Sequence, residues 1–239
     1  MKWLISSTLS LGLLVSTAIA GAAQDAPQVM VGGHLTYARA IGDFAQFVDD
    51  GFGITGHAVF AVTPDAALGL RFDLGFLQYG SQTRRTSFSG SGGLIALYLK
   101  TSNQIFFGGV GPEIGIPVGR GRIYGFGTGG YAYFITHSSL EGVNDNDEFG
   151  RTTNLSDGTF AWTSGGGIRL PISGGDFPVV IDLFTVYHGN GDATYLTPDG
   201  IRDIGGGELS IQPVRSETRL VTYRIGVSVL LGGRNPRGR

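Results

Sequence analysis

Large apolar side chains alternate with small or charged ones along many segments of this chain. In Leu68–Phe76 every even position is large and apolar, whereas the odd positions hold glycine, arginine or aspartate. A period of two predicts a β-strand with two different faces, because successive side chains of a strand point to opposite sides. One face of this strand suits apolar surroundings, and the other tolerates charge.

The same alternation predicts eight strands, each near or slightly above the 9–11 residues that cross a bilayer when tilted. They are Val29–Arg39, Gly51–Val62, Ala67–Tyr79, Gln104–Ile116, Arg122–Ile135, Thr159–Leu170, Val179–His188 and Leu220–Leu230. The connections after the second, fourth and sixth strands are short, and the other connections are longer and mostly polar. Short periplasmic turns that alternate with long external loops are typical of outer-membrane barrels. The expected fold is therefore all-β, an eight-stranded antiparallel up-and-down transmembrane β-barrel.

The first residues predict a secretory signal peptide. A short cationic start at Met1–Ile5 leads into the apolar Leu11–Val15 and then into small residues up to Ala23. We therefore divide the chain into a signal peptide (1–23), a barrel domain (24–231) and a short polar C-terminal tail (232–239). After residue 25 the chain has no run of about 20 apolar residues, so a membrane crossing would have to use strands.

Composition supports strands and narrows the chemistry. The chain holds 42 Gly, 15 Phe, 9 Tyr and 2 Trp, and this abundance of glycine and aromatic residues favours strands and turns. Cysteine is absent, which excludes disulfides and thiolate metal sites. The net charge of −2 gives no basic surface for nucleic acid.

Position parity assigns the apolar side chains to a lipid-facing surface. It also gathers aromatic residues near the loop-bearing end, where a membrane interface would hold an aromatic girdle. The predicted girdle consists of Tyr37, Phe52, Phe76, Phe106, Phe134, Phe160, Trp162 and Tyr187.

The same parity collects the charged strand residues on the opposite, interior face. They are Arg71, Asp73, Glu113, Arg169, Asp182 and Arg224, joined by His34 and His57. Eight strands enclose only enough room for side chains, and buried charges persist when they are paired. We expect a neutral, salt-bridged plug, with interior glycines making room for Tyr131 and Tyr133.

Three motifs could indicate dinucleotide binding, calcium binding or catalysis. Gly125–Gly130 fits G-x-G-x-x-G, but the following residues continue as a strand where a dinucleotide site needs a helix. The acidic run Asn144–Glu148 could hold Ca²⁺, but a solvated loop tip is the simpler interpretation. His188 lies at the loop end of the seventh strand, near acidic and serine residues of the loops, yet no spacing fixes a catalytic triad. We therefore expect no catalytic, cofactor or metal site.

Taken together, the chain resembles the small eight-stranded outer-membrane barrels of the OmpA/OmpX and opacity-protein type. The resemblance rests on the signal peptide, the eight strands and the loop rhythm, together with Asn103–Gly115 followed by Arg122–Gly127. One departure is the last strand, which ends at Leu231 rather than at an aromatic residue. The apolar run Gly93–Leu99 could extend a strand or pack over the barrel mouth.

This resemblance implies a monomer in the outer membrane of a Gram-negative-type bacterium. Its partners would be outer-membrane lipid, lipopolysaccharide and, during insertion, the barrel-assembly machinery, without nucleic acid. The expected function is non-enzymatic, in envelope structure or in surface interaction through four long external loops. The alternatives are a narrow porin-like channel, a lipid-modifying hydrolase that uses His188 or another residue at the rim, and a soluble secreted sandwich or lipocalin-like barrel, because parity alone does not separate inside from outside.

Overall fold

A computed structural model describes residues 28–87, 96–142, 148–174, 177–205 and 208–231. The predicted signal peptide, the predicted C-terminal tail and most of the acidic run at 144–148 lie outside these ranges. Among the described residues, no helix has the length and apolar character needed to cross a membrane.

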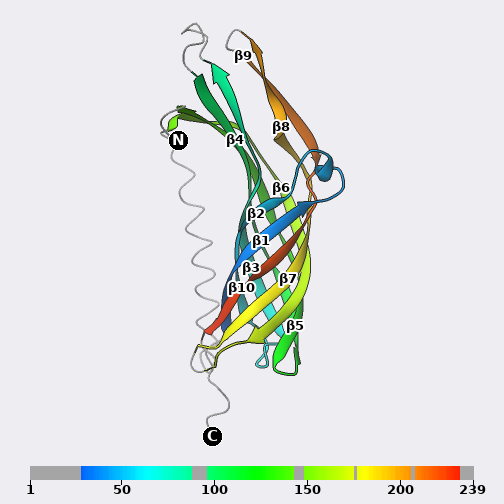
Figure 1. Cartoon of the computed structure of the whole chain (residues 1–239). Helices are drawn as coiled ribbons and strands as arrows, with labels where there is room; N and C mark the ends of the chain where they lie inside the picture. The colour runs from blue at the N-terminus through cyan, green and yellow to red at the C-terminus, as the bar shows by residue number, and fades with distance from the viewer. Residues whose placement is uncertain (1–27, 88–95, 143–147, 175–176, 206–207, 232–239) are drawn as a thin grey trace, which may run out of the picture.

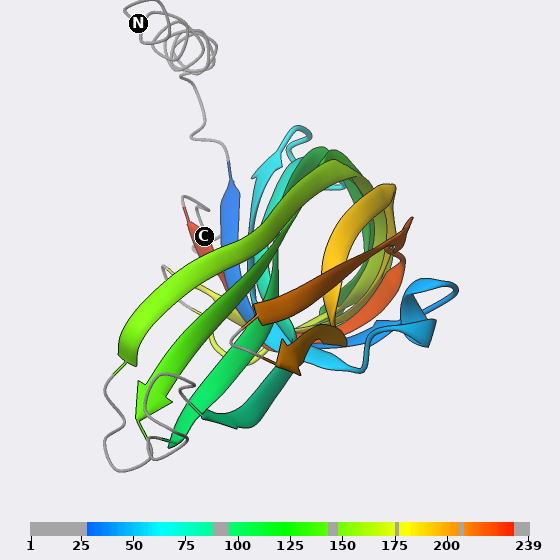
Figure 2. The same ribbon diagram turned by 90° about the horizontal axis from the view of Figure 1, so that it is seen from above.

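Eight strands form a closed barrel (Figures 1 and 2). They are β1 (Val29–Ala40), β2 (Gly51–Ala61), β3 (Leu68–Ser87), β4 (Ala96–Val118), β5 (Gly121–Gly142), β6 (Glu148–Pro171), β7 (Val179–Asn190) and β10 (Leu220–Leu231). The order around the barrel is β1-β10-β7-β6-β5-β4-β3-β2, and every neighbouring pair is antiparallel. This arrangement confirms the predicted eight-stranded antiparallel fold.

The first and last barrel strands close the sheet. Val29 of β1 stands opposite Leu231 of β10, and the ladder continues to Ala40 opposite Leu220. Closure removes the exposed strand edges that would otherwise bind another chain. It also places the beginning of β1 and the end of β10 together at the turn-bearing end of the barrel (Figure 1).

Four strands are longer than their apolar alternation predicts. β3 and β4 pair as far as Ser87 and Ala96, and β5 and β6 pair as far as Glu141 and Glu148. Two predicted long loops are therefore largely strand, because a backbone ladder can continue after the apolar alternation ends. Within the ambiguous run at 93–99, residues 96–99 begin β4, and residues 93–95 lie outside the described ranges.

The last predicted long loop contains a separate hairpin. It pairs β8 (Asp192–Gly205) with β9 (Glu208–Glu217), and Figure 2 shows it lying across part of the ring of strands. The backbone N–H of Thr194 donates to Asp157 Oδ2 on β6 at 2.7 Å, which ties the hairpin to the wall. The alternation does not predict these two strands, because prolines at 198 and 213 interrupt it. A short 3₁₀ helix, η1 (Phe44–Gln46), occupies the first long connection.

Local side chains close the first short turn. The N–H of Leu68 donates to Thr63 Oγ1 at 3.0 Å, and the N–H of Ala67 donates to Asp65 Oδ1 at 3.1 Å. Arg122 of β5 donates to the carbonyl oxygens of Ala66 and Asp65 at 2.6 and 2.7 Å. These contacts hold the turn against its neighbour and fix the entry into β3.

Candidate functional site in the barrel interior

The charged side chains of the strands meet inside the barrel and alternate in sign. All six are buried, and they come from β3, β4, β6, β7 and β10. At the centre, Glu113 accepts hydrogen bonds from two arginines, Arg71 at 2.8 Å and Arg169 at 2.5 and 2.9 Å. Arg71 also donates to both carboxylate oxygens of Asp73, at 2.7 and 2.9 Å. Buried guanidinium groups are thus paired through geometry that suits their planar fork.

Asp182 ends one side of this chain of charges. Its Oδ2 lies 3.2 Å from Arg169 Nε and accepts from the hydroxyl of Ser228 at 3.2 Å. Its Oδ1 accepts from the hydroxyl of Tyr124 at 2.5 Å. His34 Nε2 and His57 Nε2 lie next to the same carboxylate, at 3.7 and 3.8 Å from its Oδ2.

Arg224 ends the other side. Its Nη1 lies 3.6 Å from Asp73 Oδ1, and its Nε donates to Thr222 Oγ1 at 3.1 Å. Its Nη2 lies 3.1 Å from His188 Nε2, which is also 3.1 Å from Thr222 Oγ1. His188 is buried in the interior rather than exposed at the rim, and its partners Thr222 and Arg224 do not form a catalytic triad with it.

Aromatic rings line the charged chain and cover the arginines. Arg71 lies 4.0 Å from the ring centre of Phe126, and Arg169 lies 3.8 Å from that of Tyr124. Such cation–π contacts stabilise guanidinium groups that have left water. Parity predicts that Tyr131 and Tyr133 face the interior, and this prediction is wrong, because both side chains are exposed whereas Tyr124 and Phe126 of the same strand are buried.

Within the charged part of the interior, a cavity of about 10 Å³ lies beside Asp73, Thr128, His188 and Arg224. That volume holds roughly one water molecule.

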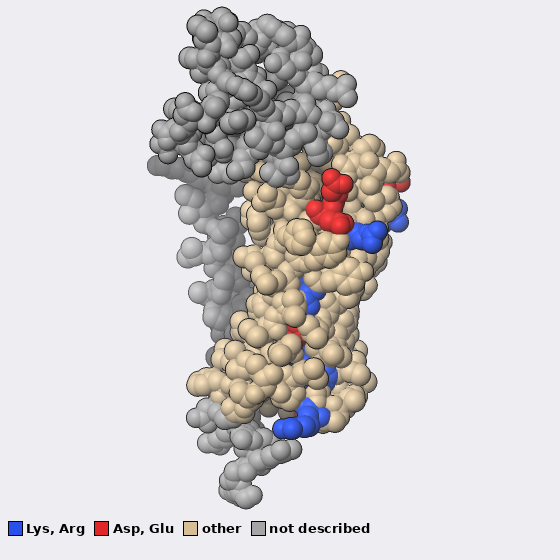
Figure 3. Space-filling view, in the orientation of Figure 1, with Lys and Arg blue, Asp and Glu red and all other residues tan. Residues whose placement is uncertain are grey.

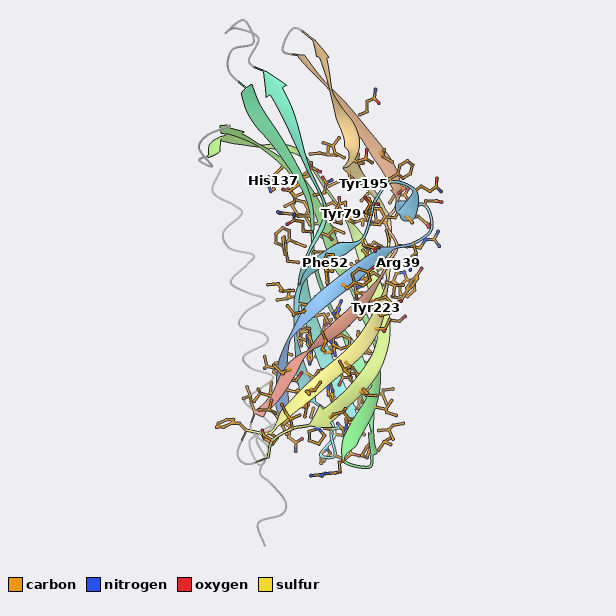
Figure 4. The ribbon with its side chains drawn as sticks, viewed as in Figure 1. Arg39, Phe52, Tyr79, His137, Tyr195 and Tyr223 are labelled. Carbon is orange, nitrogen blue, oxygen red and sulfur yellow. The ribbon has the colours of Figure 1, made fainter. Side chains whose placement is uncertain are left out.

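Above the charges, towards the loop-bearing end, the interior becomes apolar. Phe134, Leu77 and Ile105 from the wall pack with Phe44 of η1 and Tyr195 of β8 in one buried cluster. The ring centre of Phe44 lies 5.1 Å from that of Tyr195 in an edge-to-face arrangement. Figure 4 shows Tyr79 and Tyr195 on this side of the barrel, beyond Phe52 and Tyr223.

Most of the aromatic side chains predicted for a membrane-interface girdle lie on the outer wall of the barrel. Ring contacts join Tyr37 to Phe52, Phe76 to Phe106 and Trp162 to Tyr187 on adjacent strands, and Phe160 is also exposed. Phe134, however, is only 1% exposed and belongs to the interior cluster.

Strand register explains why the inward and outward faces of β5 are the reverse of those that parity predicts. Phe106 of β4 stands opposite Tyr133 of β5, and directly opposed residues share a face. Tyr133 is 40% exposed and Tyr131 is 55% exposed, so these two tyrosines take the outward place on β5. The alternation in β5 lacks a charged residue between Ile123 and Ile135 that could mark the inner face.

The rest of the outer wall is apolar. Exposed large apolar side chains recur on β1 to β6 and on β10, and in Figure 3 charged atoms are sparse on the wall and gather towards its ends. An open apolar hollow of about 670 Å³ lies on this surface between β2 and β5, beside Ile54, Leu74, Phe106 and Tyr131. Apolar side chains outside and paired charges inside reverse the arrangement of a soluble protein.

This is the architecture of a small outer-membrane β-barrel. The reversed faces also overturn the alternative of a soluble sandwich or lipocalin-like barrel. No protein-family model matches the chain, and comparison with curated proteins gave no match.

Solved structures with a similar fold include Ail, the attachment invasion locus protein, the outer membrane protein OprG and a neisserial surface protein. Ail from Yersinia pestis has a TM-score of 0.46 at 10% identity, over 86% of this chain and 99% of that one. OprG from Pseudomonas aeruginosa has a TM-score of 0.46 at 10% identity, over 87% and 98%. Neisserial surface protein A has a TM-score of 0.39 at 12% identity, over 84% and 96%. Similarity this low transfers no ligand or activity.

Proposed function

We propose that this chain is an integral outer-membrane protein of a Gram-negative-type bacterium, with a plugged interior and a non-enzymatic role at the cell surface. The observation that carries the proposal is the continuous chain of buried ion pairs from Arg224 through Glu113 to Asp182. Side chains that satisfy one another across the lumen leave little free charge to attract or conduct a solute. The proposed partners are outer-membrane lipid and lipopolysaccharide, with insertion of a monomer by the barrel-assembly machinery.

The apolar cluster at the loop-bearing end supports the same proposal. Phe44 and Tyr195 enter it from elements outside the barrel wall, so the mouth is closed as well as the lumen. The extended strands β3 to β6 and the β8–β9 hairpin then present surface beyond the girdle (Figure 1). We propose that envelope structure or surface interaction resides in these projecting segments.

Flux through the purified protein tests the plug. In liposomes that contain the full mature chain, we expect no release of a small entrapped dye and no steady conductance across a planar bilayer. A steady conductance whose ion selectivity changes in Arg71→Gln would instead support the porin-like alternative. The control is Arg215→Gln, because Arg215 lies on the exposed hairpin and takes no part in the interior network.

Localisation is tested separately. We expect the protein to sediment with outer membranes and to migrate differently on a denaturing gel before and after heating. Recovery in the soluble periplasmic fraction would contradict an integral barrel. For the hydrolase alternative, a lipid A acylation change that is lost in His188→Gln would be required.

A further inference from the structure

Two histidines and one aspartate converge at the turn-bearing side of the interior. His34 Nε2 lies 3.7 Å and His57 Nε2 lies 3.8 Å from Asp182 Oδ2. The three candidate ligand atoms all lie within 4.8 Å of one another. The residues come from three different strands, β1, β2 and β7, so only the closed barrel assembles them.

The imidazole nitrogens of His34 and His57 are buried but lack hydrogen-bond partners among the described residues. Both side chains are at most 1% exposed, and none of their four ring nitrogens has a hydrogen-bond partner among the described residues. Buried polar groups in proteins are nearly always hydrogen-bonded, and an unpaired one calls for an explanation such as an ion. The distances to Asp182 are too long for hydrogen bonds but leave space for an atom between the groups.

The surrounding backbone keeps this space open. A Cβ atom at Gly32 would lie 2.7 Å from His57 Cε1, 3.1 Å from His34 Cε1 and 2.3 Å from Ser228 Oγ. The two imidazole rings are stacked, with centres 4.9 Å apart. Glycine at position 32 thus allows both rings and the serine hydroxyl to approach one point.

We propose that His34, His57 and Asp182 bind a divalent late transition-metal ion of the Zn²⁺ class. Neutral imidazole nitrogens and a carboxylate oxygen are ordinary zinc ligands at about 2.0–2.2 Å, and three protein ligands leave a fourth position open. The sequence placed both histidines in the interior but predicted no metal there. These residues come together because β2 pairs with β1, β1 with β10 and β10 with β7, in a register that brings the three side chains to one level of the barrel.

The neighbours of Asp182 suit a metal ligand. Tyr124 and Ser228 donate to the carboxylate and fix its orientation, as outer partners of metal sites commonly do. Arg169 lies 3.2 Å from the same Oδ2, but it also donates twice to Glu113. Arg169 therefore keeps a charged partner when the ion takes that oxygen.

Position in the barrel indicates the route of entry. Asp182 lies three residues after the start of β7, and Ser228 lies three residues before the end of β10. Both positions are near the turn-bearing end, away from the apolar cluster at the other mouth. In the proposed membrane orientation the ion would arrive from the periplasm.

Zinc titration of the purified, untagged mature chain in detergent tests the proposal. After dialysis against a chelator and then chelator-free buffer, calorimetry is expected to show about one Zn²⁺ per chain, with two imidazole ligands by X-ray absorption. Mg²⁺ should not bind, because it prefers oxygen ligands. His34→Gln and His57→Gln should each lose the binding, and Tyr124→Phe should weaken it about tenfold.

His188→Gln is the matched control, because His188 is another buried histidine, outside this cluster. It should leave the stoichiometry unchanged. Variants that keep the heat-dependent gel migration are folded. If a histidine variant does not fold, the X-ray absorption spectrum of the natural chain and the zinc titration of Tyr124→Phe test the proposal instead. Absence of zinc binding, a spectrum without imidazole, or binding unchanged in a folded His34→Gln or His57→Gln would overturn the proposal.

Discussion

The barrel interior is held together in two different ways at its two ends. At the turn-bearing end, six charged side chains pair with one another between aromatic rings. At the loop-bearing end, Phe134 and its neighbours form an apolar cluster that η1 and β8 complete. Inside the barrel each buried charge must be paired with an opposite charge. At the loop-bearing end, segments outside the wall supply apolar side chains that pack against the cluster. The barrel therefore needs exact sign complementarity in one region and only suitable volume in the other.

Glu113→Gln should break the charged region and give the largest effect. Removing this carboxylate leaves Arg71 and Arg169 without their shared anion, and breaking a buried pair costs about 3–5 kcal/mol. We expect that loss in the free energy of unfolding, measured by urea titration of the barrel in lipid vesicles. Glu217→Gln removes an exposed partner of Arg219 and should cost about 1 kcal/mol or less. Equal losses in the two variants would argue against the network.

Phe134→Ala should break the apolar region. The side chain is fully enclosed, and truncation of a buried phenylalanine costs about 3 kcal/mol. Tyr133→Ala, one residue away but on the outer wall, should have a clearly smaller effect in the same urea titration. A larger loss for Tyr133→Ala would restore the original assignment of β5.

Gly75→Ala tests the boundary between the two regions. A Cβ atom there would lie 2.1 Å from the ring of Phe107, which packs against His188 and faces Arg224. Overpacking of this kind costs about 1–3 kcal/mol. A Cβ atom at Gly33 would meet nothing within 4 Å, so Gly33→Ala should be tolerated. The urea midpoints of unfolding of the two variants provide the comparison.

The smallest effect is expected outside both regions, at the first turn. Hydrogen bonds from Thr63 and from the Ala67 backbone hold the pKa of Asp65 below its usual value. A lowered folded-state pKa stabilises the folded protein at neutral pH, and this contribution is lost as the pH falls through the folded pKa. Asp65→Asn should therefore reduce the difference between urea midpoints at about pH 7 and about pH 3. An unchanged difference would show that the turn does not depend on the carboxylate.

Strand existence and facing were predictable wherever a charge marked the inner side. In β3, Arg71 and Asp73 identify that face, and both side chains are buried as parity predicts. In β5 no charge breaks the run of glycine and aromatic residues, so Phe134 and the two tyrosines were assigned to the wrong sides. The β8–β9 hairpin was missed because proline obscured its alternation. Alternation carries facing information only when its two faces differ in polarity.

The sequence by itself determined that this chain forms eight two-faced strands joined by alternating short and long connections. Period-two alternation is a local property, since each side chain's direction follows from that of its neighbour. Tertiary structure alone decided which charges meet, which aromatic residues of β5 face inward, and that His34, His57 and Asp182 share one point. Those contacts depend on strand register and closure around the barrel, which join residues up to about 200 positions apart and are set by packing of the whole wall.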